Sequence, residues 1–199
     1  IQGGDADKRF NYADVGGIVG YNYGKISDCE TQNTKIMAGA HAQVQKSYMA
    51  YAGGICGYNM GEISKVKSAT KYETLSFEGR TLSPDYLGGI AGYNKDGIIT
   101  RATSQTTTTT YTSLNDRKRY FGGVVGANKG HTYSNCANYG DIIYEGGAKI
   151  RIGGIASYTN KVATGVVRCN ITAECTEYDY SEIGGVISYT SGSEVTGAT

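Results

Sequence analysis

The stretch VGGIVGYNYG, at residues 15–24, returns five more times with variations along the chain of 199 residues. The later versions read AGGICGYNMG from residue 52, LGGIAGYNKDG from 87, FGGVVGANKG from 121, IGGIASYTN from 152 and IGGVISYTSG from 183. Their Gly-Gly pairs begin at residues 16, 53, 88, 122, 153 and 184, which gives repeat lengths of 31–37 residues. A unit of this size that recurs in order is typical of a stacked array.

The segments around each block indicate strands and tight corners. An Asn-x-Gly sequence follows several blocks, as in Asn22-Tyr23-Gly24, and both Asn and Gly tolerate the positive φ of a tight turn. A second strand follows, and the variable remainder of each repeat has room for a third strand and a surface loop. No stretch shows the spacing of an amphipathic helix. The sequence therefore predicts an all-β, repeat-built β-solenoid, similar to a parallel β-helix, with six tandem repeats.

This solenoid is predicted to be a single domain over residues 1–199. Residues 1–14 form a lead-in, the repeats start near 15, 52, 87, 121, 152 and 183, and the last repeat is truncated. An uncapped last coil would expose ladder hydrogen bonds, so we expect a further domain of a longer chain to cover it, with a neighbouring molecule or the last repeat folding back as the alternatives. The chain begins at Ile1 with no Met and no signal-like segment, so we expect a mature fragment or a cut piece.

The block itself is interpreted as one strand buried on both faces, because each face carries an apolar residue. In the first repeat, one face reads Val15, Gly17, Val19 and Tyr21, and the other reads Gly16, Ile18, Gly20 and Asn22. Stacking places like residues over like at about 4.8 Å. This predicts an Ile ladder (Ile18, Ile55, Ile90, Val124, Ile155, Val186), a Tyr ladder (Tyr21, Tyr58, Tyr93, Ala127, Tyr158, Tyr189) and an Asn ladder (Asn22, Asn59, Asn94, Asn128).

The Tyr ladder leaves two readings open. It either holds the register of the stack or lines a ligand-binding groove. The ligand-binding residues stay unknown at this stage.

The quoted blocks resemble the bacterial GLUG motif, whose repeats run roughly GGIVGYNxGxIxNCxxxG. VGGIVGYNYGKISDC at residues 15–29 and AGGICGYNMGEISKV at 52–66 are the nearest matches, and repeats five and six are looser. The resemblance implies an extracellular β-solenoid of the kind found in bacterial surface and adhesin-like proteins and in non-catalytic parts of IgA-specific metallopeptidases. It implies no catalytic residue.

Charge gives no global attraction to nucleic acid or to an anionic membrane, because 19 basic and 18 acidic residues leave a net charge of +1. No apolar run approaches the roughly 20 residues of a membrane-spanning helix. The densest basic stretch, Arg117-Lys118-Arg119, is interpreted as a solvated loop, with an anion contact as the alternative.

Metal and nucleophile motifs are missing from the sequence. His41 and His131 belong to no HExxH, the five Cys form no CxxC, and no GxSxG is present. We expect no metal and no cofactor. The cysteines are interpreted as small buried hydrophobes, with a Cys169–Cys175 disulfide as the alternative. Cys29, Cys136 and Cys169 are expected to share one apolar slot with Val66 and Ala102.

Two acidic clusters and one run of threonines are the remaining candidates for a functional site. The clusters are Glu174, Glu177, Asp179 and Glu182, and Asp5, Asp7 and Asp14, and we interpret both as solvated loops. The run Thr106–Thr110 favours a strand.

We expect a non-enzymatic extracellular module of a bacterial cell-surface protein, which binds host or community glycans or proteins and acts as a spacer. The alternative is a β-helical glycoside hydrolase or polysaccharide lyase. Such an enzyme would need two carboxyl groups about 5–10 Å apart in an aromatic cleft.

Overall fold

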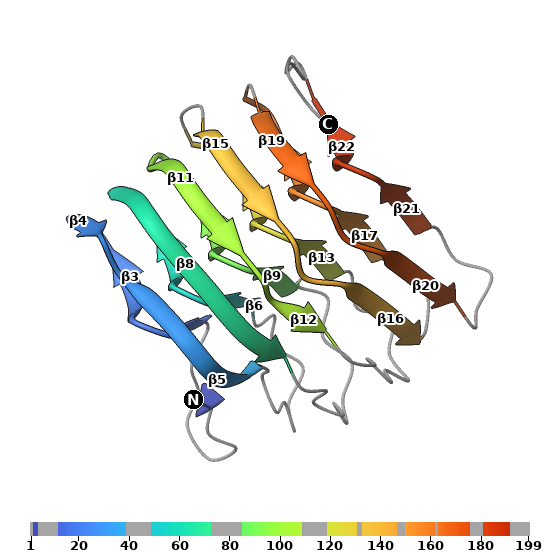
Figure 1. The fold of residues 1–199 in the computed structure, drawn as a ribbon, viewed down its shortest axis with the longest axis horizontal. Helices are drawn as coiled ribbons and strands as arrows, with labels where there is room; N and C mark the ends of the chain where they lie inside the picture. Colours follow the sequence, from blue (N-terminus) through green and yellow to red (C-terminus); the bar gives the residue numbers. More distant parts are fainter. Residues whose placement is uncertain are drawn as a thin grey trace.

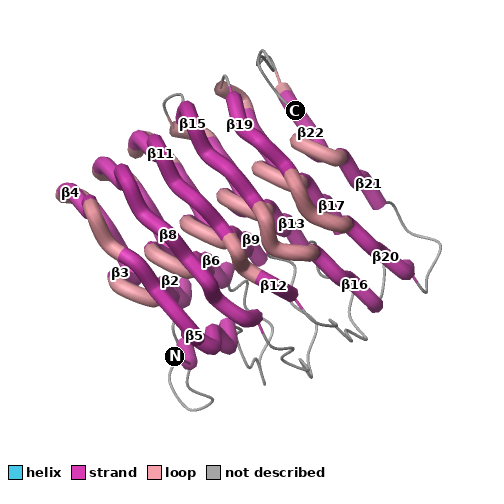
Figure 2. The backbone as a smooth tube through the Cα atoms, in the orientation of Figure 1, coloured by secondary structure: helices cyan, strands magenta, loops and turns pink. Residues whose placement is uncertain are grey.

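The protein is a parallel β-solenoid with no helix in the described part of the chain (Figures 1 and 2). The computed structural model describes residues 2–3, 12–38, 49–72, 85–108, 119–130, 133–146, 150–161, 163–175 and 181–191. All recorded strand pairs are parallel, as expected when equivalent segments of successive coils stack on one another. The predicted all-β repeat fold is thereby confirmed.

Two short-stranded sheets each take one strand from every repeat, in sequence order. Sheet 1 contains β2 (Tyr12–Gly16), β6 (Met49–Gly53), β9 (Asp85–Gly88), β13 (Arg119–Gly122), β17 (Ile150–Gly153) and β21 (Ser181–Gly184). Sheet 2 contains β3 (Val19–Asn22), β7 (Cys56–Asn59), β10 (Ala91–Asn94), β14 (Val125–Asn128), β18 (Ala156–Thr159) and β22 (Ile187–Thr190). The pairing register joins equivalent residues, so the ladders predicted from the repeat are present in the stack.

Sheet 3 is the larger third wall, and its long strands form the front layer in Figure 1. Its ten strands are β1 (Gln2–Gly3), β4 (Lys25–Ser27), β5 (Glu30–Ala38), β8 (Glu62–Tyr72), β11 (Ile98–Ser104), β12 (Thr107–Thr108), β15 (Tyr133–Asn138), β16 (Ile142–Gly146), β19 (Ala163–Val167) and β20 (Ile171–Cys175). In repeats one to five, the strands that follow the block are thus segments of this wall.

The repeated block is two strands and a bend, so its interpretation as one straight strand was wrong. β2 ends at Gly16 and β3 begins at Val19. A β-carbon at Gly16 would collide with the carbonyl oxygen of Val19 and would stand 2.8 Å from that of Ile55. Only glycine allows the chain to turn this sharply between sheets 1 and 2. The alternation of faces along a strand does not continue through such a bend.

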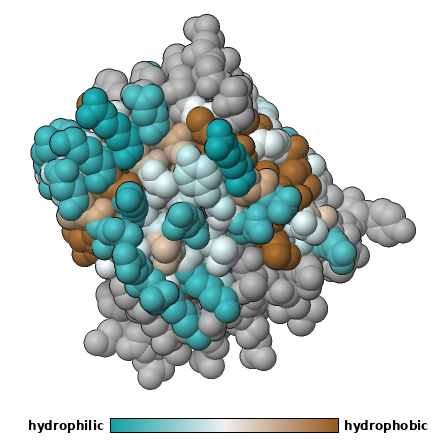
Figure 3. All heavy atoms as spheres, viewed as in Figure 1, coloured by the Kyte–Doolittle hydropathy of each residue, from teal (hydrophilic) through white to brown (hydrophobic). Residues whose placement is uncertain are grey.

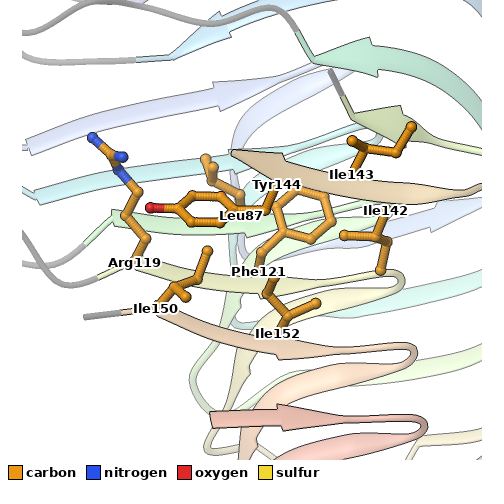
Figure 4. A pocket seen from close by; sticks show the side chains of 8 residues that line it. All are labelled: Leu87, Arg119, Phe121, Ile142, Ile143, Tyr144, Ile150 and Ile152. Atoms are coloured by element: carbon orange, nitrogen blue, oxygen red, sulfur yellow. The ribbon is translucent and has the colours of Figure 1, made fainter. Parts of the chain in front are cut away.

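The core fills the space between sheet 3 and the other two sheets. One cluster joins sheets 2 and 3 and contains the inner part of the Ile ladder, where Ile55, Ile90, Val124 and Ile155 are fully buried. The second cluster joins sheets 1 and 3 (Figure 4). The space left inside this second cluster is about 10 Å³, which is at most the size of one water molecule. The interior therefore offers no room for an organic ligand there.

The interpretation of the basic stretch Arg117-Lys118-Arg119 as a solvated loop was wrong for Arg119. Arg117 and Lys118 lie outside the described residues, but Arg119 begins β13 and is only 3 % exposed. Its Nε lies 4.0 Å from the Asp85 carboxylate, which is also buried. β13 pairs with β9 so that Arg119 lies beside Asp85, and this register brings a buried charge next to its counter-ion. The sequence pattern could not show this because the partner comes from the preceding coil.

A candidate ligand-binding surface

The Tyr ladder is a column of stacked rings on sheet 2. The centroids of Tyr21 and Tyr58 are 4.7 Å apart, and those of Tyr58 and Tyr93 are 5.2 Å apart, with the rings within 25° of parallel. Ala127 interrupts the column, which resumes with Tyr158 and Tyr189 at 5.8 Å. The spacing follows the distance between paired strands, and each ring covers a face of its neighbour.

A second column on sheet 1 was missed by the sequence analysis. It holds the residue two positions before each Gly-Gly pair, namely Asp14, Tyr51, Tyr86, Tyr120, Arg151 and Glu182. Tyr51 and Tyr86 stack at 5.5 Å, and Tyr86 and Tyr120 stack at 4.9 Å. The signal was present in the sequence, because an aromatic residue stands at this offset in three consecutive repeats. The bend inside the block, which brings this offset beside the Tyr ladder, was not anticipated.

Edge-to-face contacts join the two columns into one surface. Tyr51 meets Tyr58 at 5.1 Å and 85°, and Tyr86 meets Tyr93 at 5.2 Å and 74°. Tyr51 and Tyr93 are the most buried of these rings, whereas Tyr21 and Tyr189 at the two ends are more than a third exposed. The two columns together are called the tyrosine surface below. Stacking thus makes a continuous aromatic patch whose rings are best exposed to a ligand at its two ends.

Two cations lie in the C-terminal half of the tyrosine surface. The Lys129 ammonium lies 6.0 Å from the Tyr93 centroid and 5.8 Å from the Tyr158 centroid. These two rings flank Ala127, where the column has no ring. The Arg151 guanidinium lies 4.1 Å from the Tyr189 centroid, and its Nε is 2.6 Å from the Glu182 carboxylate. Both positions are favourable because ring faces attract cations.

At the other end, the tyrosine surface opens into a hollow of about 320 Å³. Asp14, Tyr21, Met49, Tyr51 and Tyr58 line it. The Tyr51 hydroxyl donates to the Met49 sulfur at 3.0 Å, and the Tyr21 hydroxyl approaches the sulfur of Met60 at 2.9 Å. Oδ1 of Asp14 is buried and accepts no hydrogen bond.

Burial and neighbouring groups raise the pKa of several of these phenols. Burial, followed by the neighbouring Tyr93, raises the pKa of Tyr58 to about 12. Burial likewise raises the pKa of Tyr93 to about 12, with Tyr158 and Asp96 adding to the effect. The pKa of the Asp14 carboxyl is also raised by burial. Tyr58 and Tyr93 therefore present neutral hydroxyl groups at physiological pH.

The Asn ladder has a structural role at the corner between sheets 2 and 3. Each side-chain amide donates to the next residue of the ladder, from Asn22 to Asn59 (2.8 Å), Asn94 (2.8 Å) and Asn128 (2.7 Å), and finally to Thr159 (3.2 Å). These residues are at most 5 % exposed. They are thus internal spacers and not ligand contacts.

The acidic clusters are only partly within the described residues. Asp5, Asp7, Glu177 and Asp179 lie outside them, as do His41 and His131. Glu174 is exposed on β20, whereas Glu182 pairs with Arg151 and Asp14 lines the hollow, so neither of these two is a solvated loop residue. Within the described part of the chain, no three His, Cys, Asp or Glu residues are grouped to hold a metal ion.

Four of the five residues expected to share the cysteine slot lie there, and three of them are fully buried. Cys29, Val66, Ala102 and Cys136 follow one another in register, and Cys136 is 1 % exposed, so burial raises its pKa to about 12. Cys29, however, is only half-buried, and in repeat five Gly165 pairs with Cys136. Placing Cys169 in the slot was therefore wrong: Cys169 is a half-buried free thiol that accepts a hydrogen bond from Asn138 at 3.2 Å.

A second, more polar hollow of about 360 Å³ lies on sheet 3, over the face where Figure 3 shows hydrophilic side chains. Four consecutive coils kink there at residues with positive φ: Asp28, Lys65, Arg101 and Asn135. Two ion pairs already cross this hollow, Lys25–Glu62 at 3.1 Å and Lys65–Asp28 at 3.7 Å. Its charges are largely matched within the chain, which makes the tyrosine surface the stronger candidate.

Comparison with protein-family models, with curated proteins and with solved structures gives no significant match for this chain. Among the described residues, no helix has the length and apolar character needed to cross a membrane.

Proposed function

We propose that this chain is a non-enzymatic binding and spacing module of a bacterial cell-surface protein, and that it binds its ligand through the tyrosine surface. The observation that carries the proposal is the pair of joined aromatic columns, which present ring edges, hydroxyl groups and two cations along one side of a rigid stack. Tyrosine combines a large apolar area with a hydrogen-bonding group at low entropic cost, which suits a binding surface.

The arrangement of carboxylates favours binding over glycoside hydrolysis. Within the two columns the carboxylates are Asp14 on the first rung and Glu182 on the last. Five strand spacings separate them, or about 24 Å. A glycosidase pair needs about 5–10 Å, and Glu182 is already engaged by Arg151.

The extracellular location rests on the resemblance of residues 15–29 and 52–66 to the GLUG motif. A stacked solenoid suits such a location, because it separates whatever lies at its two ends by a fixed distance. The ligands that fit the surface are glycans or proteins of a host or of neighbouring cells.

An array of glycans and host proteins, probed with the purified chain, tests the proposal. We expect at least one ligand whose signal falls about tenfold or more in the double variant Tyr158→Ala/Tyr189→Ala, because both rings belong to the surface. Tyr139→Ala is the matched control, since Tyr139 is 43 % exposed and follows β15 on sheet 3. Signals that fall equally in both variants, or release of sugar from the arrayed glycans, would contradict the proposal.

A further inference from the structure

The hollow at the N-terminal end of the tyrosine surface has a carboxylate with no counter-ion among the described residues. Asp14 stands at its wall with Oδ1 buried and accepting no hydrogen bond. Around it are the rings of Tyr21, Tyr51 and Tyr58. The charge on Asp14 is close enough to act on all three phenols, where it adds to the larger effect of burial in raising their pKa.

The same arrangement occurs at the other end of the surface, where the chain supplies the cation itself. Glu182 and Tyr189 hold in the sixth repeat the positions that Asp14 and Tyr21 hold in the first. There the Arg151 guanidinium lies 4.1 Å from the Tyr189 centroid and 5.3 Å from that of Tyr120. Its Nε and Nη2 atoms reach the two Glu182 oxygens at 2.6 and 3.5 Å. A carboxylate and tyrosine rings at these positions therefore bind a guanidinium.

We propose that the hollow formed by Asp14, Tyr21, Met49, Tyr51 and Tyr58 binds the guanidinium group of an external arginine. The proposal rests on the tyrosine surface being the binding surface and names the ligand chemistry at one end of it. Asp14 would supply the negative charge, and the rings would supply cation–π contacts. The Met49 sulfur, which already accepts from the Tyr51 hydroxyl at 3.0 Å, holds that ring in place.

Guanidinium fits this site better than a compact ammonium does, for two reasons. It is planar and weakly hydrated, so it lies flat on an aromatic ring and leaves water at low cost. The hollow of about 320 Å³ is also large enough for a branched group together with part of its aliphatic stem.

The experiment is a titration of the whole chain with a short peptide that contains one arginine, followed by calorimetry and by the ring resonances of Tyr21 and Tyr51. The same peptide with citrulline is the neutral control, and free arginine shows whether the peptide backbone contributes. We expect the arginine peptide to bind at one site and to lose about tenfold or more in affinity in Asp14→Asn, because the charge-assisted contact is lost. Asp96→Asn is the matched control. Its charge acts on Tyr58 and Tyr93, but the residue does not line the hollow.

A second variant tests the likeness of the two ends. Arg151→Ala vacates the Glu182 site, and the arginine peptide should then bind at two sites in place of one. Equal affinity of the wild type for the arginine and citrulline peptides, or unchanged affinity in Asp14→Asn, would overturn the proposal. A third outcome would also overturn the proposal. If the arginine peptide bound only to a variant in which Lys8 and Arg9, outside the described residues, are both replaced by alanine, the wild-type chain would be supplying its own cation to the hollow.

Failure here is distinguishable from failure of the proposed function. Array ligands that depend on Tyr158 and Tyr189, without any binding of the arginine peptide, would remove the guanidinium site alone. An array with no such ligand would count against the broader function, while the titration would still decide the guanidinium site.

Discussion

At the scale of the residue, the second glycine of each Gly-Gly pair meets different surroundings in different coils. A β-carbon on Gly54 would collide with the Ser68 hydroxyl and the Gly89 carbonyl oxygen and would stand 2.8 Å from Oγ1 of Thr70. The equivalent Gly185, in the sixth repeat, has no atom within 4 Å of that position. Packing therefore requires the second glycine of the pair at Gly54, inside the stack, but not at Gly185, in the sixth repeat.

This contrast predicts different costs for the same substitution. We expect Gly54→Ala to lower the free energy of unfolding by about 3 kcal/mol, because backbone and side-chain atoms of two strands must move apart. Gly185→Ala should change it by less than about 0.5 kcal/mol. The entropy that alanine removes from the unfolded chain is common to both variants and cancels in the comparison. Thermal or urea denaturation measures the difference, and equal losses in the two variants would refute the packing argument.

At the scale of the element, side-chain hydrogen bonds between neighbouring strands set the register of sheet 2. Asn94 accepts from Asn59 at 2.8 Å and donates to Asn128 at 2.7 Å and to the Gly97 carbonyl at 2.9 Å. Because Asn94 is fully buried, removal of its amide would take one hydrogen bond from each of these partners, although Asn59 would still donate to the Gly61 carbonyl at 3.1 Å.

Asn94→Ala should therefore lower the free energy of unfolding by about 3–4 kcal/mol, as each unsatisfied buried group costs about 1–3 kcal/mol. Asn94→Thr should cost less, since Thr159 stands at this position in repeat five and its hydroxyl accepts from Asn128 at 3.2 Å. Urea denaturation of the two variants gives the order directly. A loss in Asn94→Ala no greater than in Asn94→Thr would show that the ladder does not bear on stability.

The elements also show where sequence reasoning succeeded and where it ended. The repeat, the parallel stacking and the Asn and Tyr ladders were predictable, because a residue recurring at a fixed offset lies above its own copies in a solenoid. The bend at Gly17 and Ile18 was not, because glycine pairs fit a straight strand equally well in sequence. Because the bend was not anticipated, the second column and the position of Asp14 on its first rung were not predicted either. Arg119 was misjudged because a run of charges does not reveal the buried Asp85 of the previous coil.

At the scale of the whole molecule, the stack concentrates phenol groups that are easier to ionise in the unfolded chain. The pKa values of Tyr58 and Tyr93 are both about 12 in the folded protein, compared with an ordinary value of 10. A group whose pKa is raised by folding stabilises the protein fully below its unfolded pKa and loses this contribution as the pH rises towards the folded value.

The free energy of unfolding should accordingly fall as the pH is raised from about 10 to about 12. Urea denaturation at a series of pH values, with tyrosinate absorbance followed in parallel, measures this fall. The double variant Tyr58→Phe/Tyr93→Phe should lose less stability over the same range, because two of the titrating groups are gone. A wild type as stable at pH 11.5 as at pH 9 would contradict the expected protection of the phenols.

The parallel register of all three sheets also determines how the molecule would respond to mechanical force. Backbone hydrogen bonds such as Ile55 N to the Ile90 oxygen, at 3.0 Å, connect one coil to the next and thus run along the direction in which the coils stack. Tension applied between the two ends loads these bonds one row at a time, so the coils would peel off singly and not shear all at once. Each coil of 31–37 residues would release roughly 100–130 Å of extended chain. Under tension the stack would behave as an extensible tether that lengthens by one coil at a time.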